Sequence, residues 1–170
     1  TVGVIGMGYV GLPLAILAAK KNFRVFGYER DPYRLSMLKK KKSYFTNIPS
    51  SSLRVFSKKT KFFKKFSNIS ECDILIICLP TPLKKNRPDL SHIITSMKSI
   101  YPQLKKGQLL ILESTSYPGT TREELCEKLY SKFRLGKEFF VGFSSERINP
   151  GINDKKIDVI PKVVSGYSRK

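Results

Sequence analysis

A glycine-rich turn near the amino terminus has the residue types and the spacing of a dinucleotide-binding site. Six residues form the pattern G-x-G-x-x-G: Gly6, Met7, Gly8, Tyr9, Val10 and Gly11. The first glycine of such a pattern allows a tight turn, the second lets the backbone approach a pyrophosphate, and the third lets the helix pack closely on the strand. The pyrophosphate would lie on the free N–H groups at the start of the helix, where the helix dipole favours an anion.

An acidic residue follows this turn at the distance that a dinucleotide site requires. Glu29 lies eighteen residues after Gly11, at the end of a second expected strand. A carboxylate at this place can accept both ribose hydroxyls of NAD, and it would repel the 2′-phosphate of NADP. The alternative is a glycine turn that only packs a helix on a strand. The strand before the turn, the helix after it and the acidic Glu29 are all at the positions that a dinucleotide site requires, so the sequence favours a binding site for NAD.

Three other polar clusters follow expected strands. They are Pro-Thr-Pro at 80–82, Glu-Ser-Thr at 113–115 and Ser-Ser-Glu-Arg at 144–147. In open parallel sheets, ligands bind outside the carboxyl ends of the strands. Serine and threonine also cap loops for purely structural reasons. Three such clusters at one edge of a sheet nevertheless favour a shared site.

The elements that would position these residues alternate between strand and helix. This alternation predicts an α/β fold, a Rossmann-like doubly wound parallel sheet with helices on both faces. Strands are expected at 2–5, 24–28, 73–79, 108–112 and 138–142, with short ones near 61–66 and 163–164. Helices are expected at 10–21, 31–41 and 88–101. A further helix would begin at a capping box of Thr120 and Glu123, and its buried side would carry Leu125, Cys126, Leu129 and Phe133.

Length and composition predict one domain over residues 1–170, with 41% hydrophobic residues to fill a core. The sequence predicts neither a membrane span nor a signal peptide. The three cysteines lack metal-binding spacing, so we expect no metal site and a reduced, cytoplasmic compartment. Cys78 and Cys126 are expected to be inert buried thiols, and His92 to lie on a helix face.

The net charge of +19 is unusual for such a domain. Lysines cluster at 39–42, 58–65 and 84–85. A nucleic-acid surface is one interpretation, and solvated helix faces and loops are the other. The lysines follow no single recognition helix or known nucleic-acid motif, so the second interpretation is favoured.

Four ordered motifs resemble the amino-terminal domain of nucleotide-sugar 6-dehydrogenases, over essentially the whole chain. They are GVIGMGYVGLPLA at 3–15, LPTPL at 79–83 with PDL at 88–90, ESTSYPGTT at 113–121 and FSSERINPG at 143–151. The third and fourth motifs look most like the branch acting on UDP-N-acetylglucosamine. The branches acting on UDP-N-acetylgalactosamine and UDP-N-acetylmannosamine are close rivals, and the UDP-glucose enzymes are more distant.

The resemblance implies that the C6 alcohol of a UDP-sugar is oxidised to a carboxylate with two NAD, for polysaccharide precursor synthesis. A family cysteine captures the aldehyde, a second hydride leaves, and water cleaves the thioester. Thr81 and Glu113 would line the further course of NAD. Thr115 would position a catalytic water or polarise the oxygen at C6, and Glu146 would act as a base or orient the water.

Three departures from the family pattern bear on these expectations. Glu29 replaces a more usual aspartate, and Ser145 stands where proline is usual. Pro150 occupies the place of a second glutamate in the UDP-glucose branch, which argues against UDP-glucose.

The family's catalytic cysteine, its lysine and asparagine partners and its sugar-nucleotide domain would all lie beyond Lys170. We therefore expect this chain to be the NAD-binding part of a longer homo-oligomeric enzyme, inactive by itself. A stand-alone NAD-binding or regulatory module and a basic nucleic-acid binder are the alternatives.

Overall fold

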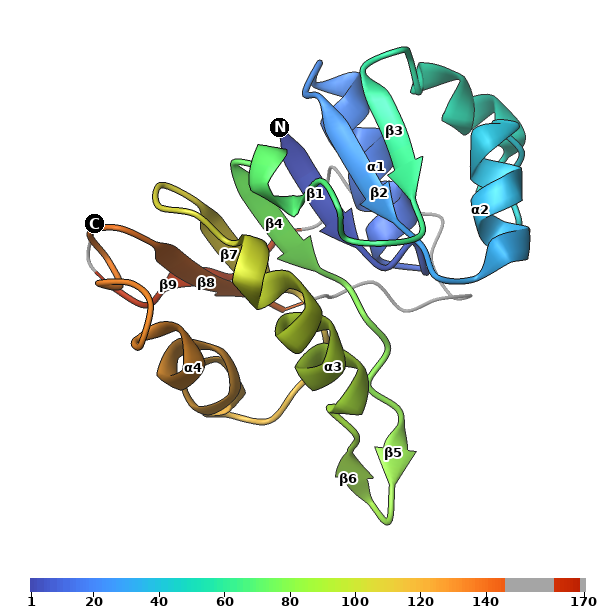
Figure 1. Cartoon of the computed structure of the whole chain (residues 1–170). Helices are drawn as coiled ribbons and strands as arrows, with labels where there is room; N and C mark the ends of the chain where they lie inside the picture. The colour runs from blue at the N-terminus through green and yellow to red at the C-terminus, as the bar shows by residue number, and fades with distance from the viewer. Residues whose placement is uncertain (146–160, 169–170) are drawn as a thin grey trace.

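The computed structural model describes residues 1–145 and 161–168 of the chain (Figure 1). Its centre is a sheet of β1 (Val2–Ile5), β2 (Val25–Tyr28), β3 (Thr60–Phe63), β4 (Ile74–Ile77), β7 (Leu109–Leu112), β8 (Phe140–Ser144) and β9 (Val164–Gly166). The strand order is β3-β2-β1-β4-β7-β8-β9, and all neighbours are parallel except β8 and β9. The winding reverses between β1 and β4, where open α/β sheets bind their ligands.

Helices connect the parallel strands. They are α1 (Gly11–Lys20) between β1 and β2, α2 (Pro32–Lys39) after β2, and α3 (Ser91–Ile100) before β7. Between β7 and β8, a π-helical segment (Thr121–Cys126) continues into α4 (Glu127–Leu129). Short 3₁₀ turns occupy Ser50–Val55, Ile69–Glu71 and Tyr101–Gln103. A hairpin of β5 (Leu83–Lys84) and β6 (Arg87–Pro88) projects from the body of the molecule in Figure 1.

Each face of the sheet is covered by its own hydrophobic cluster. Leu12 of α1 and Leu38 of α2 belong to the cluster on one face. Ile93 of α3 and Leu129 of α4 belong to the cluster on the other face. The central strands β1, β4 and β7 are apolar along their whole length because both of their faces are covered. The doubly wound parallel sheet expected from the sequence is therefore confirmed.

The fourth expected helix begins differently from the prediction, and the proposed capping box is wrong. The backbone of Thr120 is already helical, with φ −48° and ψ −45°. Its hydroxyl donates to the carbonyl of Tyr117 at 2.8 Å, and the N–H of Glu123 donates to the carbonyl of Gly119 at 3.0 Å. A capping residue normally has an extended backbone, so Thr120, with its helical backbone, makes no side-chain capping bond. The predicted inward side of the helix is correct, since Leu125, Cys126, Leu129 and Phe133 are all buried.

Several other element boundaries differ from the sequence expectation: β2 begins at Val25, β3 spans Thr60–Phe63, β4 spans Ile74–Ile77 and α3 spans Ser91–Ile100. Two further differences have a clear physical cause. The strand expected at 138–142 begins at Phe140, because Glu138 is held in the preceding turn. Its carboxylate accepts the N–H of Arg134 at 3.0 Å and pairs with Lys106 at 2.9 Å. The β5–β6 hairpin was not expected; Lys85 and Asn86 at its tip have φ values of 51° and 60°, the left-handed backbone of a tight hairpin turn.

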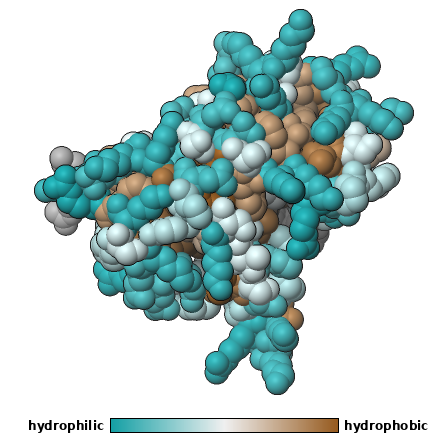
Figure 2. Space-filling model, viewed as in Figure 1, coloured by the Kyte–Doolittle hydropathy of each residue, from teal (hydrophilic) through white to brown (hydrophobic). Residues whose placement is uncertain are grey.

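The lysine clusters identified in the sequence are exposed. Lysines 39–42 lie on and after α2, those of 58–65 lie on and around β3, and Lys84 and Lys85 lie on the hairpin. Hydrophilic side chains accordingly project over much of the face seen in Figure 2. Within the described ranges, no helix is both long and apolar enough to cross a membrane.

A buried glutamine ties the start of β7 to the segment before β4. The side-chain amide of Gln108 donates to the carbonyls of Ile69 at 3.0 Å and Cys72 at 2.6 Å. Its side-chain oxygen accepts the N–H of Lys105 at 2.8 Å. Gln108, Ile69 and Cys72 are all fully buried, so water cannot replace the glutamine as the donor to these two carbonyls.

We therefore expect Gln108→Leu to lower the free energy of unfolding by about 2–4 kcal/mol, because the buried Cys72 carbonyl and the N–H of Lys105 lose their side-chain partner, while the Ile69 carbonyl keeps only the N–H of Cys72. Urea denaturation followed by circular dichroism measures this change. Gln103→Leu is the matched control, since Gln103 makes one exposed 3.5 Å contact with the carbonyl of Ser99. Equal stability of the two variants would contradict the role given to Gln108.

Candidate cofactor-binding site

The three glycines of the turn are required for three different reasons. Gly6 has φ +93°, and a Cβ atom there would lie 2.6 Å from the carbonyl oxygen of Cys78. A Cβ atom at Gly11 would lie 1.8 Å from the carbonyl oxygen of Gly6, so α1 packs directly on the turn. A Cβ atom at Gly8 would meet nothing within 4 Å. The fold itself thus requires Gly6 and Gly11, whereas Gly8 keeps space open beside the backbone.

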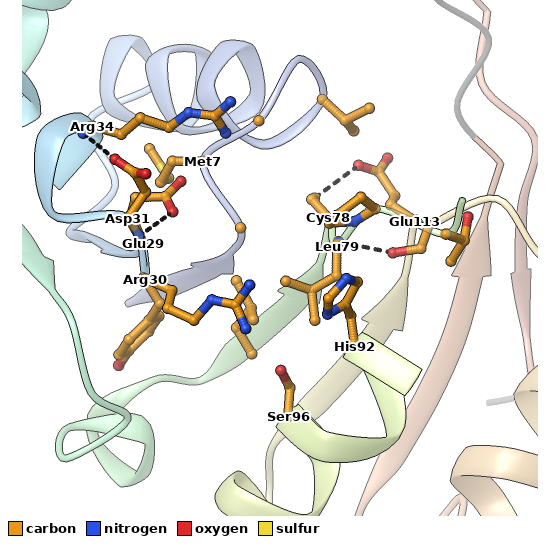
Figure 3. A pocket seen from close by; sticks show the side chains of 18 of the residues that line it. Met7, Glu29, Arg30, Asp31, Arg34, Cys78, Leu79, His92, Ser96 and Glu113 are labelled. Carbon is orange, nitrogen blue, oxygen red and sulfur yellow. Dashed lines mark hydrogen bonds between the residues drawn. The ribbon is translucent and has the colours of Figure 1, made fainter. Parts of the chain in front are cut away.

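The space beside Gly8 is part of a cavity of about 1140 Å³ at the carboxyl ends of the strands (Figure 3). Its walls come from the glycine turn, the end of β2, α3 and the loops that follow β4 and β7. Small-molecule sites typically measure roughly 300–1,000 Å³, so the cavity has room for a large ligand such as a dinucleotide. All but one of the predicted site residues that the structure describes line this cavity: Gly6, Gly8, Tyr9, Val10, Glu29, Thr81, Glu113 and Thr115. The exception is Gly11, which packs against the turn.

Glu29 lies at the end of β2 on one side of the cavity. Its side chain is only 8% exposed, and one carboxylate oxygen accepts the N–H of Asp31 at 2.9 Å. The N–H of Glu29 donates to the carbonyl of Phe63 at the end of β3. Both ends of the residue are therefore fixed. A fixed carboxylate beside the cavity is a suitable acceptor for ribose hydroxyls.

Two aromatic residues that the sequence analysis did not assign support the glycine turn. The hydroxyl of Tyr44 donates to the carbonyl of Met7 at 2.5 Å. The ring of Phe45 lies 4.1 Å from the ring of Tyr9. Burial raises the pKa of Tyr44 well above its usual value, and the Glu29 carboxylate adds to this rise. In the sequence, Tyr44 and Phe45 stand out only as two adjacent aromatic residues after a run of lysines. Nothing in the sequence indicates that they contact the glycine turn.

The loops after β4 and β7 are joined side by side. The hydroxyl of Thr81 donates to the carbonyl of Thr115 at 2.7 Å. The hydroxyl of Ser114 accepts the N–H of Leu79 at 2.9 Å and donates to the carbonyl of Ile77 at 3.3 Å. Two polar clusters that are 34 residues apart in sequence thus form one wall of the cavity.

Glu113 is the second carboxylate of the cavity wall. It is 4% exposed and pairs with the ammonium of Lys162, which precedes β9. The thiol of Cys78 donates to its other carboxylate oxygen at 3.8 Å. Cys78 is buried as expected, but it also lines the cavity, as does His92 of α3. Burial raises the pKa of the Cys126 thiol to about 11, consistent with an inert core position.

The fold brings two of the three expected polar clusters to the cavity, those at 80–82 and 113–115. Ser144 and Ser145 of the third cluster do not line it, because Ser144 is buried in β8. Glu146 and Pro150 lie outside the described residues. The residues that are described fit a dinucleotide in two respects. Gly8 leaves open the space that a side chain would fill, and Glu29 holds a carboxylate at the end of β2.

Comparison with known families gives a match over residues 1–170 to the NAD-binding domain of the UDP-glucose/GDP-mannose dehydrogenase family. The chain is 37% identical over 169 residues to the UDP-N-acetyl-D-glucosamine 6-dehydrogenase of Pseudomonas aeruginosa, covering 97% of the chain and 39% of that relative. It is 35% identical over 168 residues to the enzyme of the same name from Salmonella typhi, and the match covers 97% of the chain and 39% of that relative. The chain therefore spans about two fifths of the length of these relatives.

Solved structures show the same architecture. An NDP-N-acetyl-D-galactosaminuronic acid dehydrogenase from Methanosarcina mazei matches with a TM-score of 0.89 and 31% identity, over 99% of this chain and 39% of that one. A UDP-N-acetyl-mannosamine dehydrogenase from Staphylococcus aureus matches with a TM-score of 0.88 and 26% identity, over 99% of this chain and 41% of that one.

The different roles of the glycines generate a paired prediction. We expect Gly8→Val to abolish NAD binding with little loss of stability, because the new side chain fills cavity space. We expect Gly11→Ala to lower the free energy of unfolding by about 1–3 kcal/mol, because its Cβ meets the Gly6 carbonyl. Calorimetry with NAD and urea denaturation separate the two effects. Normal NAD binding by Gly8→Val would show that the turn is only a packing feature.

Proposed function

The chain belongs to the UDP-glucose/GDP-mannose dehydrogenase family as its NAD-binding domain, and we propose that it forms the cofactor half of a UDP-sugar 6-dehydrogenase. The observation that carries the proposal is a single cavity whose walls combine the glycine turn, Glu29 and the Thr81–Thr115 pair. UDP-N-acetylglucosamine is the substrate that we favour, because two relatives named for it are 37% and 35% identical to the chain. UDP-N-acetylmannosamine and UDP-N-acetylgalactosamine are the rival substrates.

In this proposal the pyrophosphate of NAD lies against Gly8, between the turn and the start of α1. Tyr9 and Val10 line the same side of the cavity. The carboxylate of Glu29 accepts the hydroxyls of the adenosine ribose, and the N–H of Asp31 keeps it in place. Thr81 and Glu113 line the remaining course towards the nicotinamide, at the ends of β4 and β7.

NAD supplies the hydride acceptor, and the residues of the chain position the reacting groups. The hydrogen bond from Thr81 to the carbonyl of Thr115 fixes the loop that presents Thr115 to the cavity. We assign to Thr115 the positioning of a catalytic water or the polarisation of the oxygen at C6. We assign to Glu146, beyond the described residues, the role of a base or water-orienting group. The Lys162 ammonium balances the charge of Glu113, so the cavity wall beside Cys78 is not left with an uncompensated buried anion.

The proposal also covers a further domain, the oligomeric state and the cellular compartment. The relatives are more than twice as long as this chain, and we propose that a further domain supplies the nucleophilic cysteine and most contacts to the UDP-sugar. We propose a homo-oligomer in the cytoplasm that makes polysaccharide precursors. A stand-alone NAD-binding module is the alternative, and the restoration experiment below separates it from an enzyme.

The first prediction of this proposal concerns cofactor choice. We expect the chain to bind NAD more than about tenfold tighter than NADP, since a 2′-phosphate would lie against the Glu29 carboxylate at a cost of several kcal/mol. Isothermal titration calorimetry with each cofactor measures the ratio. Equal affinities would remove the assignment of Glu29 as the ribose acceptor.

The second prediction concerns turnover. We expect the purified 170-residue chain, given NAD and UDP-N-acetylglucosamine, to make no sustained NADH. Hydride transfer needs the C6 alcohol held beside the nicotinamide, and a misplacement of about 1 Å can cost roughly a hundredfold in rate. Absorbance at the NADH band over many turnovers is the measurement. Sustained NADH from this chain would show that its active site is already complete.

Restoring the carboxyl-terminal half, in trans or in one chain, should bring activity back. In that enzyme Thr115→Ala and Glu146→Gln should lower turnover more than they weaken NAD binding. If no activity returns although NAD still binds, the stand-alone binding module is the better description.

A further inference from the structure

Two arginines lie at the ribose end of the cavity beside Glu29. Arg30 follows Glu29 directly, and Arg34 is in the first turn of α2; both line the cavity. In Figure 3 the carboxylates of Glu29 and Asp31 lie between the two arginine side chains. Within residues 1–145 and 161–168, neither guanidinium forms an ion pair with a carboxylate. The end of the cavity thus holds two cations whose charge is not neutralised by direct pairing there.

The two carboxylates differ in what holds them. Glu29 is buried, and its oxygen accepts the N–H of Asp31 at 2.9 Å. Asp31 caps α2, and its oxygen accepts the N–H of Arg34 at 2.8 Å. Asp31 is therefore committed to starting the helix, whereas the charge of Glu29 faces the place assigned to the ribose. Removing Glu29 takes one negative charge away from the end of the cavity that Arg30 and Arg34 line.

Arg34 is held at its position by aromatic rings. Its guanidinium carbon lies 5.5 Å from the ring centre of Tyr44 and 5.8 Å from that of Phe45. These are distances at which a cation is attracted to a ring face. The same two aromatics support the glycine turn, so Arg34 and the pyrophosphate side of the cavity are positioned together.

We propose that the cavity is a latent NADP site: Arg30 and Arg34 are placed to hold a 2′-phosphate, and the carboxylate of Glu29 alone excludes it. Guanidinium groups bind phosphate through paired, charge-assisted hydrogen bonds, and two of them bordering one carboxylate supply the donors. Specificity here comes from repulsion of the wrong cofactor and not from a lack of groups that could bind it. The inference deepens the proposed function and rests on it, because it assumes that the adenosine ribose lies at Glu29.

The test compares Glu29→Ser with the unchanged chain, using calorimetry with NAD and NADP. We expect NADP affinity to rise at least about tenfold in Glu29→Ser, because a serine hydroxyl can donate to the phosphate and the repulsion is gone. Adenosine 2′,5′-bisphosphate and AMP serve as half-cofactor probes. A gain for the bisphosphate without a gain for AMP would assign the effect to the 2′-phosphate.

The arginines are tested in the Glu29→Ser background. Adding Arg30→Met or Arg34→Met should each reverse the gain in NADP affinity by about tenfold, while NAD affinity changes much less. Lys40→Met in the same background is the matched control. It removes one exposed cation at the far end of α2, outside the cavity, and should leave the gain intact.

The outcomes distinguish this inference from the proposal on which it rests. If the unchanged chain fails to bind NAD, the proposed function fails. If it binds NAD and Glu29→Ser shows no gain for NADP, only the latent site is overturned. The latent site is also overturned if Lys40→Met reverses the gain as fully as the two arginine variants, since net charge alone would then explain it.

Discussion

The close contact between the start of α1 and the glycine turn is the constraint on which the rest of the molecule depends. No side chain fits at Gly11, because a Cβ atom would lie 1.8 Å from the Gly6 carbonyl. This contact brings the first helix down onto the end of β1, which is the central strand beside the winding reversal. On the cavity side of the same turn, Gly8 leaves the backbone without a side chain. The same turn therefore sets the packing of the fold and the shape of the site, through different residues.

Much of the architecture follows from sequence because its signals are local. Continuous apolar runs such as 74–77 predict strands buried on both faces, and glycines at fixed spacing predict the turn that follows β1. The element boundaries predicted from the sequence were less accurate where side chains make contacts across a turn. Glu138 looks like part of a strand, but a backbone N–H and two cations hold it in the preceding loop. Thr120 and Glu123 have the spacing of a capping box, but the backbone of Thr120 is helical and its side chain makes no capping bond.

The candidate site shows the same division between local and distant signals. Gly8 and Glu29 could be assigned because each belongs to a pattern with fixed spacing. Thr81 and Thr115 were assigned through family resemblance, and only the fold brings them into hydrogen-bond contact. The contacts of Tyr44 and Lys162 could not be foreseen, because they join segments 37 and 49 residues apart without any motif. Residues that support a site from a distance leave no pattern in a single sequence.

The position of β1 in the sheet also has a consequence for how the chain folds. Its register pairs Val2 with Val25 on one side and with Ile74 on the other, 72 positions later. During folding, one edge of β1 therefore stays unpaired until β4 pairs with it. The free edge of β4 in turn stays unpaired until β7 forms. Contacts of such long sequence separation are formed slowly, because loop closure comes before any gain from pairing. The half-built sheet exposes an apolar edge during that interval, so the order of strands that creates the ligand crevice also makes the nascent domain prone to aggregation.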